Sequence, residues 1–375
     1  MKLDLKYLDS TQRIIFSLVP LYSRYGYTPY KMGKFEEYDL YSKNKDFLVS
    51  DSVITFTDTN GKLMALKPDV TLSIIKNSDP SASGVQKVYY NENVYRVSKG
   101  TNTFKEIPQV GLECIGEVDT FDRGEVLLLA AKSLETLSDS FVLEVSHLGI
   151  LSAVIDSITQ SYGVKKKLLD CVNEKNLHSV DGILKENNIS SELAEPLKHL
   201  INLYGAPQKV FKELEQLESA LPIKPLADEF KEALSIFEGT GLEDRILVDF
   251  SAVGDFNYYN GIIFNGFING VPHSVLSGGQ YDNLIKKMKR GPRAIGFAVY
   301  LDLLERLDTQ YDGYDADVLL VYGDSSDVKE IKAAQEKFLN EGKTVLCANN
   351  FNTNLKFREY YKLEKSGVIP FEYNA

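Results

Sequence analysis

The sequence has 375 residues, of which 43% are hydrophobic and 25% charged, and this balance excludes a disordered chain and suggests two or three globular domains. Its formal net charge of −11 disfavours nucleic-acid binding, which usually needs a basic surface against phosphates. No apolar run approaches roughly 18 residues and the first residues alternate in charge, so we expect no membrane span and a cytoplasmic location. The three cysteines, Cys114, Cys171 and Cys347, lack metal-ligand spacing, which predicts neither a disulfide framework nor a metal site.

Helix and hairpin signals come first along the chain. After Asp9, which can cap a helix, apolar residues recur at helical spacing over residues 10–24. Residues 51–57 and 62–66 are rich in β-forming side chains, and an Asp-Thr-Asn-Gly turn at 58–61 separates them. Because an Asn-Gly turn between two such runs is a strong hairpin signal, we expect an antiparallel pair here.

Two further strands and a run of helices are expected next. Residues 85–96 and 109–117 are strand-like and extend the antiparallel pairing. Helix-periodic segments then follow at residues 125–137, 148–162, 166–174, 194–204 and 207–237. They predict a helical insertion over about residues 163–240.

Strands return after the insertion and are followed by a separate small unit. The strands are expected at residues 245–250, 261–267 and 273–276. Residues 293–307 are expected to form a strand that leads into a helix. In residues 311–375, a strand, a helix and a second strand are expected at 316–322, up to Asn340, and at 343–347. The pattern predicts a first domain of residues 1–310 and a small α/β domain after it.

Several segments occur in an order that resembles the class II aminoacyl-tRNA synthetases, and histidyl-tRNA synthetase in particular. They lie at residues 26–29, 66–71, 95–96, 109–116, 255–261, 277–282 and 294–298. Among them, Leu-Lys-Pro-Asp-Val-Thr at 66–71 is similar to the family's Leu-Arg-Pro-Glu-x-Thr, and Ser-Gly-Gly-Gln-Tyr-Asp at 277–282 to its Ser-Gly-Gly-Arg-Tyr-Asp. The resemblance covers roughly residues 8–310 and implies an α+β fold, with an antiparallel sheet flanked by helices.

The positions that resemble the family's nucleotide-binding residues have mostly lost their positive charge. Arg96 is kept, but Ser98 stands where the family has a glutamate, and residues 102–105 replace a Gly-Arg-Tyr-Arg loop. Gly254 and Leu303 stand where the family has arginines. Arginines stabilise negative oxygens in amino-acid activation, and each lost donor costs about 3 kcal/mol of transition-state stabilisation. We therefore expect a catalytically inactive chain, with no catalytic residue to assign.

The positions that resemble the family's amino-acid pocket are largely kept. The resemblance assigns a histidine-binding role to Asp69, Thr71, Arg96, Gln109, Glu113, Tyr258 and Tyr259. It places Asp69 at the α-ammonium and the tyrosine pair at the imidazole end. Each residue taken alone has a structural interpretation, as a core tyrosine or a polar group satisfied by a neighbouring strand. Their joint presence favours a binding pocket.

A synthetase-like chain that keeps amino-acid contacts and loses nucleotide contacts is similar to one family, the regulatory subunits of short-form ATP phosphoribosyltransferase. The resemblance implies a partner, the short catalytic subunit, and histidine as the effector. It further implies a homodimer within a hetero-oligomer, with no cofactor, nucleic acid or membrane. Two alternatives stay open: an active or divergent histidyl-tRNA synthetase-like amino-acid ligase, and an RNA-binding sensor module.

Two further features of the sequence are the segment after residue 310 and a glycine pair at 278–279. The 65 residues after position 310 are acidic and short for an anticodon-binding module, and we interpret them as a remnant used in packing or assembly. Ser277-Gly278-Gly279 is either a tight turn into a helix or a place where the backbone approaches a ligand closely.

Overall fold

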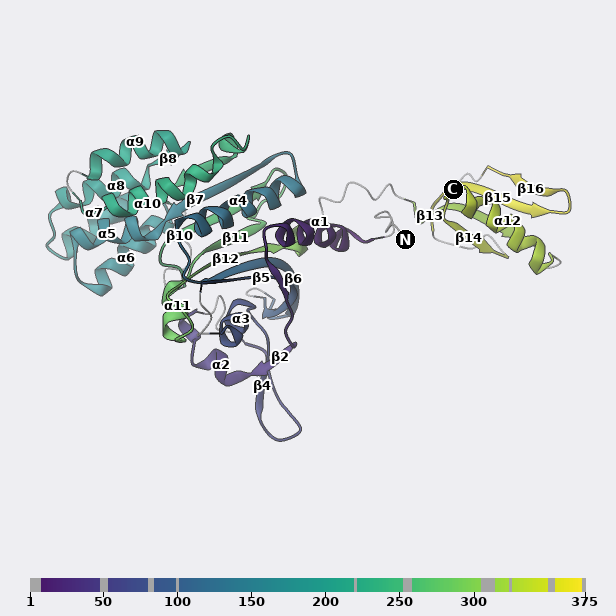
Figure 1. Cartoon of the computed structure of the whole chain (residues 1–375), viewed down its shortest axis with the longest axis horizontal. Helices are drawn as coiled ribbons and strands as arrows, with labels where there is room; N and C mark the ends of the chain where they lie inside the picture. Colours follow the sequence, from purple (N-terminus) through teal and green to yellow (C-terminus); the bar gives the residue numbers. More distant parts are fainter. Residues whose placement is uncertain are drawn as a thin grey trace. The chain divides into compact units, whose positions relative to one another are not determined.

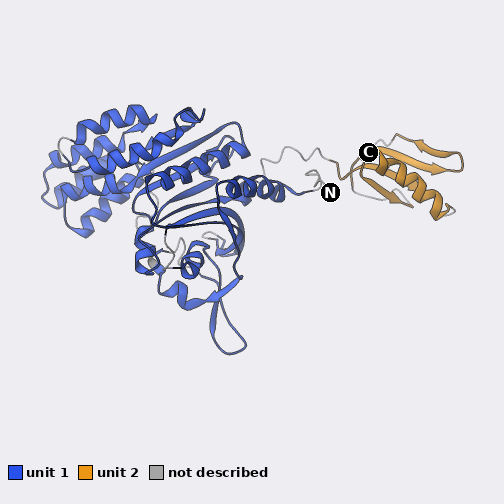
Figure 2. Cartoon of the chain, in the orientation of Figure 1, with its two compact units in different colours: residues 1–305 blue, residues 306–375 orange. Residues whose placement is uncertain are grey.

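The structure is a computed structural model that describes residues 8–47, 53–79, 84–98, 101–218, 221–251, 258–304, 314–323, 326–349 and 355–372. The chain divides into two compact units, residues 1–305 and 306–375 (Figures 1 and 2). The domain boundary expected at residue 310 lies outside the described residues. None of the helices in the described part of the chain has the length and apolar content of a membrane span.

A nine-stranded sheet forms the centre of the first unit. In spatial order its strands are β1 (Thr28–Tyr30), β5 (Val85–Val97), β6 (Phe104–Gly116), β12 (Arg293–Tyr300), β11 (Leu276–Gln280), β10 (Ile262–Ile268), β7 (Phe141–His147), β9 (Ile246–Asp249) and β8 (Tyr204–Gly205). The six central strands pair antiparallel, while β1 joins β5 and β9 joins β7 in parallel. The expected α+β architecture is therefore confirmed.

Two long helices, α1 (Ser10–Arg24) and α4 (Thr120–Leu137), run along one face of this sheet (Figure 1). Asp9 caps α1 through a capping box, as its position in the sequence predicts. The two helices meet where the buried Tyr22 hydroxyl lies 3.0 Å from the Ser133 hydroxyl. The opposite face of β5 and β6 is therefore left free for other elements.

That opposite face is covered by a small sheet and two short helices, α2 (Tyr38–Ser42) and α3 (Thr71–Asn77) (Figure 1). The small sheet has the order β2 (Phe35–Glu37), β4 (Leu63–Leu66), β3 (Thr55–Thr57). Its β3–β4 hairpin confirms the prediction from the Asn-Gly turn, and the Asp58 carboxylate accepts the Asn60 and Lys62 amides there, both at 2.8 Å. Glu36 of β2 accepts hydrogen bonds from Ser73 and Lys76, which fastens α3 in place.

A helical layer follows β7 and covers the far end of the sheet (Figure 1). Its helices are α5 (Leu148–Ile158), α6 (Tyr162–Asn173), α7 (Leu177–Glu186), α8 (Glu195–Ile201), α9 (Pro207–Glu218) and α10 (Lys224–Leu234). The helical stretch expected over 207–237 is formed by α9, α10 and a short 3₁₀ turn, η4 (Ser235–Phe237). The sequence pattern also missed α7, since only Val180 and Leu184 of that helix are buried.

The expectations for residues 273–279 also need correction. The strand predicted at 273–276 begins only at Leu276 and continues to Gln280, so Ser277-Gly278-Gly279 is neither a turn nor a helix start. A β-carbon on Gly278 would lie within 2.6 Å of the Phe264 ring, and one on Gly279 would lie 2.8 Å from the Tyr259 ring. These glycines are therefore explained by the close approach of neighbouring strands and side chains.

The second unit is a four-stranded sheet with one helix in its described residues. The sheet order is β14 (Val345–Ala348), β13 (Ala316–Tyr322), β15 (Phe357–Glu364), β16 (Gly367–Pro370). The helix α12 (Val328–Asn340) packs Ala334 and Phe338 against Val318 and Leu320. Parallel pairing of β13 with β14 confirms the expected strand–helix–strand unit, whereas β15 and β16 were not expected.

A buried ion pair holds the segment between β4 and α3. The Lys67 ammonium is paired with the Glu92 carboxylate, and their side chains are 1% and 15% exposed. We expect Lys67→Met to lower the free energy of unfolding by about 2 kcal/mol or more, because Glu92 would lose the partner of a largely buried charge. Urea denaturation measures this effect.

An exposed pair provides the control for that prediction. Lys43 and Asp39 are 73% and 70% exposed, so Lys43→Met should change the free energy of unfolding by less than about 0.5 kcal/mol. Equal effects of the two lysine substitutions would contradict a structural role for the Lys67 pair.

Candidate functional site

The seven residues assigned to a binding site from the sequence all line one cavity of about 460 Å³, including its open mouth. They come from the α3 region, β5, β6 and the segment before β10: Asp69, Thr71, Arg96, Gln109, Glu113, Tyr258 and Tyr259. The cavity lies on the sheet face opposite α1 and α4, and its lining is completed by residues including Tyr90, Ser277, Tyr281, Gly296 and Tyr300. Residues up to about 230 positions apart in sequence are thus brought together.

Strand alternation explains why β6 supplies several of these side chains. Gln109, Gly111 and Glu113 are two positions apart and therefore project to the same face of the sheet. Glu113 is directly opposite Gly296 of β12. A β-carbon on Gly296 would collide with the Glu113 carboxylate, and one on Gly111 would lie 2.5 Å from the Tyr90 hydroxyl. The absence of side chains at these glycines leaves room for the Glu113 carboxylate and the Tyr90 hydroxyl.

The start of α3 supplies the second wall of the cavity. The Asp69 carboxylate accepts the Leu72 amide at 2.9 Å, which orients it at the beginning of the helix. The Thr71 hydroxyl donates to Oε1 of Glu113 at 2.6 Å and so links the helix to β6. Arg96 donates from Nε to the main-chain oxygen of Pro68 at 3.0 Å. These bonds hold an acid, a hydroxyl and a guanidinium around one space.

Burial dominates the electrostatics of the two acids. Burial raises the pKa of Glu113 to about 8, although hydrogen bonds from Thr71 and Tyr281 favour the ionised form. Burial also raises the pKa of Asp69, and the amide of Leu72 and the charge of Arg96 oppose that shift. A ligand with an ammonium or N–H donor would relieve the cost of ionising these carboxyls.

Aromatic rings close the remaining side of the cavity. The Tyr258 and Tyr259 rings are in edge contact with centroids 4.6 Å apart, and Tyr258 also lies 5.8 Å from the Tyr281 ring. The buried Tyr281 hydroxyl donates to Oε2 of Glu113. Tyr281 was missed as a site residue, although its place in the Ser-Gly-Gly-Gln-Tyr-Asp segment was a signal that could have identified it.

Positive charge around the cavity comes from a single side chain among the described residues. Arg96 is the one lysine or arginine among the described residues that line the cavity. Leu303, where the resemblance expects an arginine, is in the 3₁₀ turn η6 (Leu301–Leu303). Gly254, Asp255 and Asn257 lie outside the described residues. Within the described residues, no group of three or more histidine, cysteine or carboxylate side chains could hold a metal ion.

The sheet, the helical layer and the cavity define a class II synthetase-like domain. A family model described as histidyl-tRNA synthetase matches residues 6–304. The fold is similar to a solved structure titled as an ATP phosphoribosyltransferase regulatory subunit/histidyl-tRNA synthetase from Bacillus halodurans, with a TM-score of 0.75 and 24% identity, covering 92% of this chain and 89% of that one. It is also similar to a chain of the ATP phosphoribosyl transferase (HisG:HisZ) complex from Thermotoga maritima, with a TM-score of 0.61 and 20% identity, covering 78% of this chain and 97% of that one.

A sequence relative narrows the class to one family. The ATP phosphoribosyltransferase regulatory subunit of Clostridium kluyveri is 30% identical over 350 residues, which are 91% of this chain and 89% of the relative. The relative from Oceanobacillus iheyensis, with the same name, is 27% identical over 304 residues, which are 80% of this chain and 75% of the relative. The chain belongs to the ATP phosphoribosyltransferase regulatory subunit family.

Proposed function

We propose that the chain is a non-catalytic regulatory subunit of ATP phosphoribosyltransferase that binds histidine in the cavity lined by β5, β6 and the α3 region. Family membership supports the regulatory role in the first step of histidine biosynthesis. The proposal of histidine as the ligand is supported by the joint presence of Asp69, Glu113 and the tyrosine pair around one small space. An amino acid with an ammonium and an imidazole complements buried carboxyls and aromatic edges.

The proposed partner of this chain is the short catalytic subunit of ATP phosphoribosyltransferase. The similarity to a chain from a HisG:HisZ complex supports such an assembly, in which we place this chain as a homodimer within a cytoplasmic hetero-oligomer. Histidine would then inhibit by binding one assembly state more tightly than another, with a coupling free energy of typically about 1–3 kcal/mol. Co-purification with the catalytic subunit, followed by assays with and without histidine, tests the assembly and the regulation together.

The alternative is an active or divergent amino-acid ligase. Unlike a regulatory subunit, such a ligase needs cations around the triphosphate of ATP. Arg96 is the one cation lining the cavity among the described residues, and its Nε is bound to Pro68. Activation of a carboxylate by ATP draws its rate mainly from such cations. We expect no histidine-dependent pyrophosphate exchange with ATP, and exchange at a rate typical of an enzyme would overturn the non-catalytic role.

The role of Asp69 can be tested with a nearly isosteric change. Asp69→Asn should weaken histidine inhibition of the assembled complex by about 10-fold to 100-fold, because the ammonium would lose a buried charged partner. The inhibition constant, measured from activity against histidine concentration, reports the change. Asp39→Asn is the control, since the Asp39 side chain is 70% exposed on α2 and should leave inhibition unchanged. Normal inhibition in Asp69→Asn would remove this residue from the site.

A further inference from the structure

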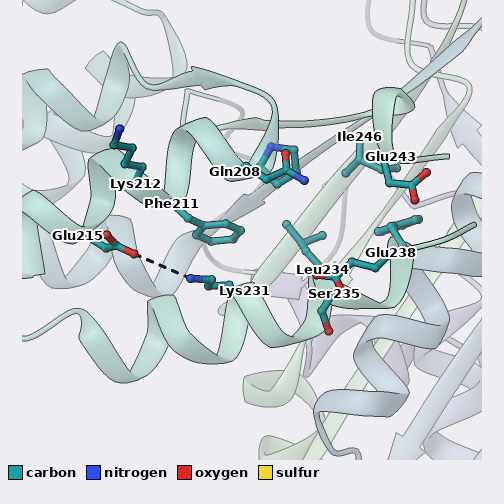
Figure 3. Close-up of a pocket in the computed structure, with 12 residues that line it drawn as sticks. Gln208, Phe211, Lys212, Glu215, Lys231, Leu234, Ser235, Glu238, Glu243 and Ile246 are labelled. Carbon is teal, nitrogen blue, oxygen red and sulfur yellow. Dashed lines mark ion pairs between the residues drawn. The ribbon is translucent and has the colours of Figure 1, made fainter. Parts of the chain in front are cut away.

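A second cavity lies in the helical layer, outside the site described above (Figure 3). It is formed by α9, α10, η4 and the start of β9, and it holds about 1000 Å³ of non-atom space, including its open mouth, against about 460 Å³ for the first cavity. Its floor is apolar and made of buried side chains, Phe211, Leu234, Phe237 and Ile246. Apolar side chains that line a hollow together with a few polar groups are typical of small-molecule sites.

Charged side chains stand at both ends of this hollow: the two lysines and Glu215 at one end, and Glu238 and Glu243 at the other (Figure 3). Lys212 of α9 and Lys231 of α10 stand at one end, with Phe211 and Leu234 between them and Glu238 at the other end. Within the described residues Lys212 has no ion pair. Lys231 has a weak one, 3.9 Å from Glu215 with both side chains 61% exposed. A pair of this kind contributes about 0–1 kcal/mol, so both ammonium groups can turn to an anion on a ligand.

The acidic end is arranged differently from the cationic end. Glu243 accepts the Gly239 amide at 2.7 Å, and hydrogen bonds from the backbone hold its pKa below the ordinary value. The negative charge of Glu243 is therefore already stabilised by nearby backbone amides. Glu238 makes no ion pair with a described residue and is exposed at the rim. One carboxylate is therefore free to accept an N–H or a cationic group from a ligand.

We propose that this hollow is a binding site for a small amphiphilic molecule with an anionic group at one end, an apolar ring in the middle and an N–H donor or amine at the other. The anion meets Lys212 and Lys231, the ring lies on Phe211 and Leu234, and the donor meets Glu238. This charge order is complementary to the lining, and the apolar floor gives the ring a surface to bury. The inference does not depend on histidine binding in the first cavity.

The site can be tested on the purified full chain with the fluorescent probe 6-anilinonaphthalene-2-sulfonate. This probe carries a sulfonate and an N–H donor at opposite ends of fused apolar rings, so it has the proposed chemistry in the proposed order. We expect saturable binding that weakens at least about fivefold in Lys212→Glu, because one attractive charge becomes repulsive. We expect it to be lost in Gln208→Trp, because the exposed Gln208 side chain lines the hollow and the larger side chain would fill it.

Controls separate this site from other surfaces that bind the probe. Lys166→Glu on α6 makes the same charge change at an exposed lysine away from the hollow and should leave binding unchanged. Thermal unfolding of each variant checks that the exposed substitutions leave the fold intact. Binding that is insensitive to both Lys212→Glu and Gln208→Trp would overturn the site.

Competition identifies the source of the anion. Adenosine monophosphate presents a phosphate and a base amine at opposite ends, and 4-(aminomethyl)benzoate presents a carboxylate and an ammonium at opposite ends of one apolar ring. Displacement of the probe by adenosine monophosphate supports a phosphate-bearing ligand, and displacement by 4-(aminomethyl)benzoate supports a carboxylate-bearing ligand. Displacement by neither would overturn the proposed ligand class.

Discussion

Gly296→Ala should reduce histidine affinity by at least about 100-fold. The added methyl group would collide with Oε2 of Glu113 and lie 2.5 Å from the main-chain oxygen of Leu112, so the carboxyl must leave its position. Its hydrogen bonds with Thr71 and Tyr281 would then break, and the cavity would lose its central acid. Overpacking of this kind also lowers the free energy of unfolding by about 1–3 kcal/mol. Calorimetric titration with histidine and urea denaturation measure the two effects.

Gly182→Ala is the matched control for that substitution. Gly182 lies in α7, and a β-carbon added there meets no atom within 4 Å. Alanine should therefore leave histidine affinity unchanged and stabilise the helix by about 0.5–1 kcal/mol. Unaltered histidine affinity in Gly296→Ala would show that the arrangement of Glu113 does not form the binding site.

Glu113→Gln should remove a large pH dependence of stability. The pKa of this carboxyl rises from 4.5 to about 8 on folding because the group is buried. Between these pH values the folded chain keeps a proton that the unfolded chain releases, so the free energy of unfolding falls as pH rises. The expected loss is a few kcal/mol across this window, with the full contribution present below about pH 4.5. Urea denaturation at pH 5, 6, 7 and 8 should show a shallower slope for Glu113→Gln than for the unchanged chain.

Histidine binding should release a proton from the same carboxyl. An N–H or ammonium group of histidine that meets Glu113 favours the ionised form, so binding near pH 7 should release up to one proton. Calorimetry in two buffers of different ionisation enthalpy measures this release, and Glu113→Gln should lower it. Glu186→Gln, at a side chain that is 71% exposed, should behave as the unchanged chain does. Equal proton release by Glu113→Gln and the unchanged chain would place histidine away from this residue.

The sequence by itself determined the elements whose signals are local. A capping residue and helical spacing over 10–24 predict α1, since the bonds that form a helix join residues four apart. An Asn-Gly turn between β-rich runs predicts the β3–β4 hairpin for a similar reason. The family and the candidate site residues also came from the sequence, because short motifs keep their order along a chain.

The tertiary structure alone decided how those residues meet. Glu113 lies beside Gly296, Thr71 and Tyr281 because of strand register and helix position, which depend on contacts between distant segments. Its raised pKa follows from the burial that these contacts create, and no spacing along the chain reports burial of this kind. The hollow between α9 and α10 could not be predicted from the sequence either. Its lining comes from several elements, and the space depends on how these elements pack against one another.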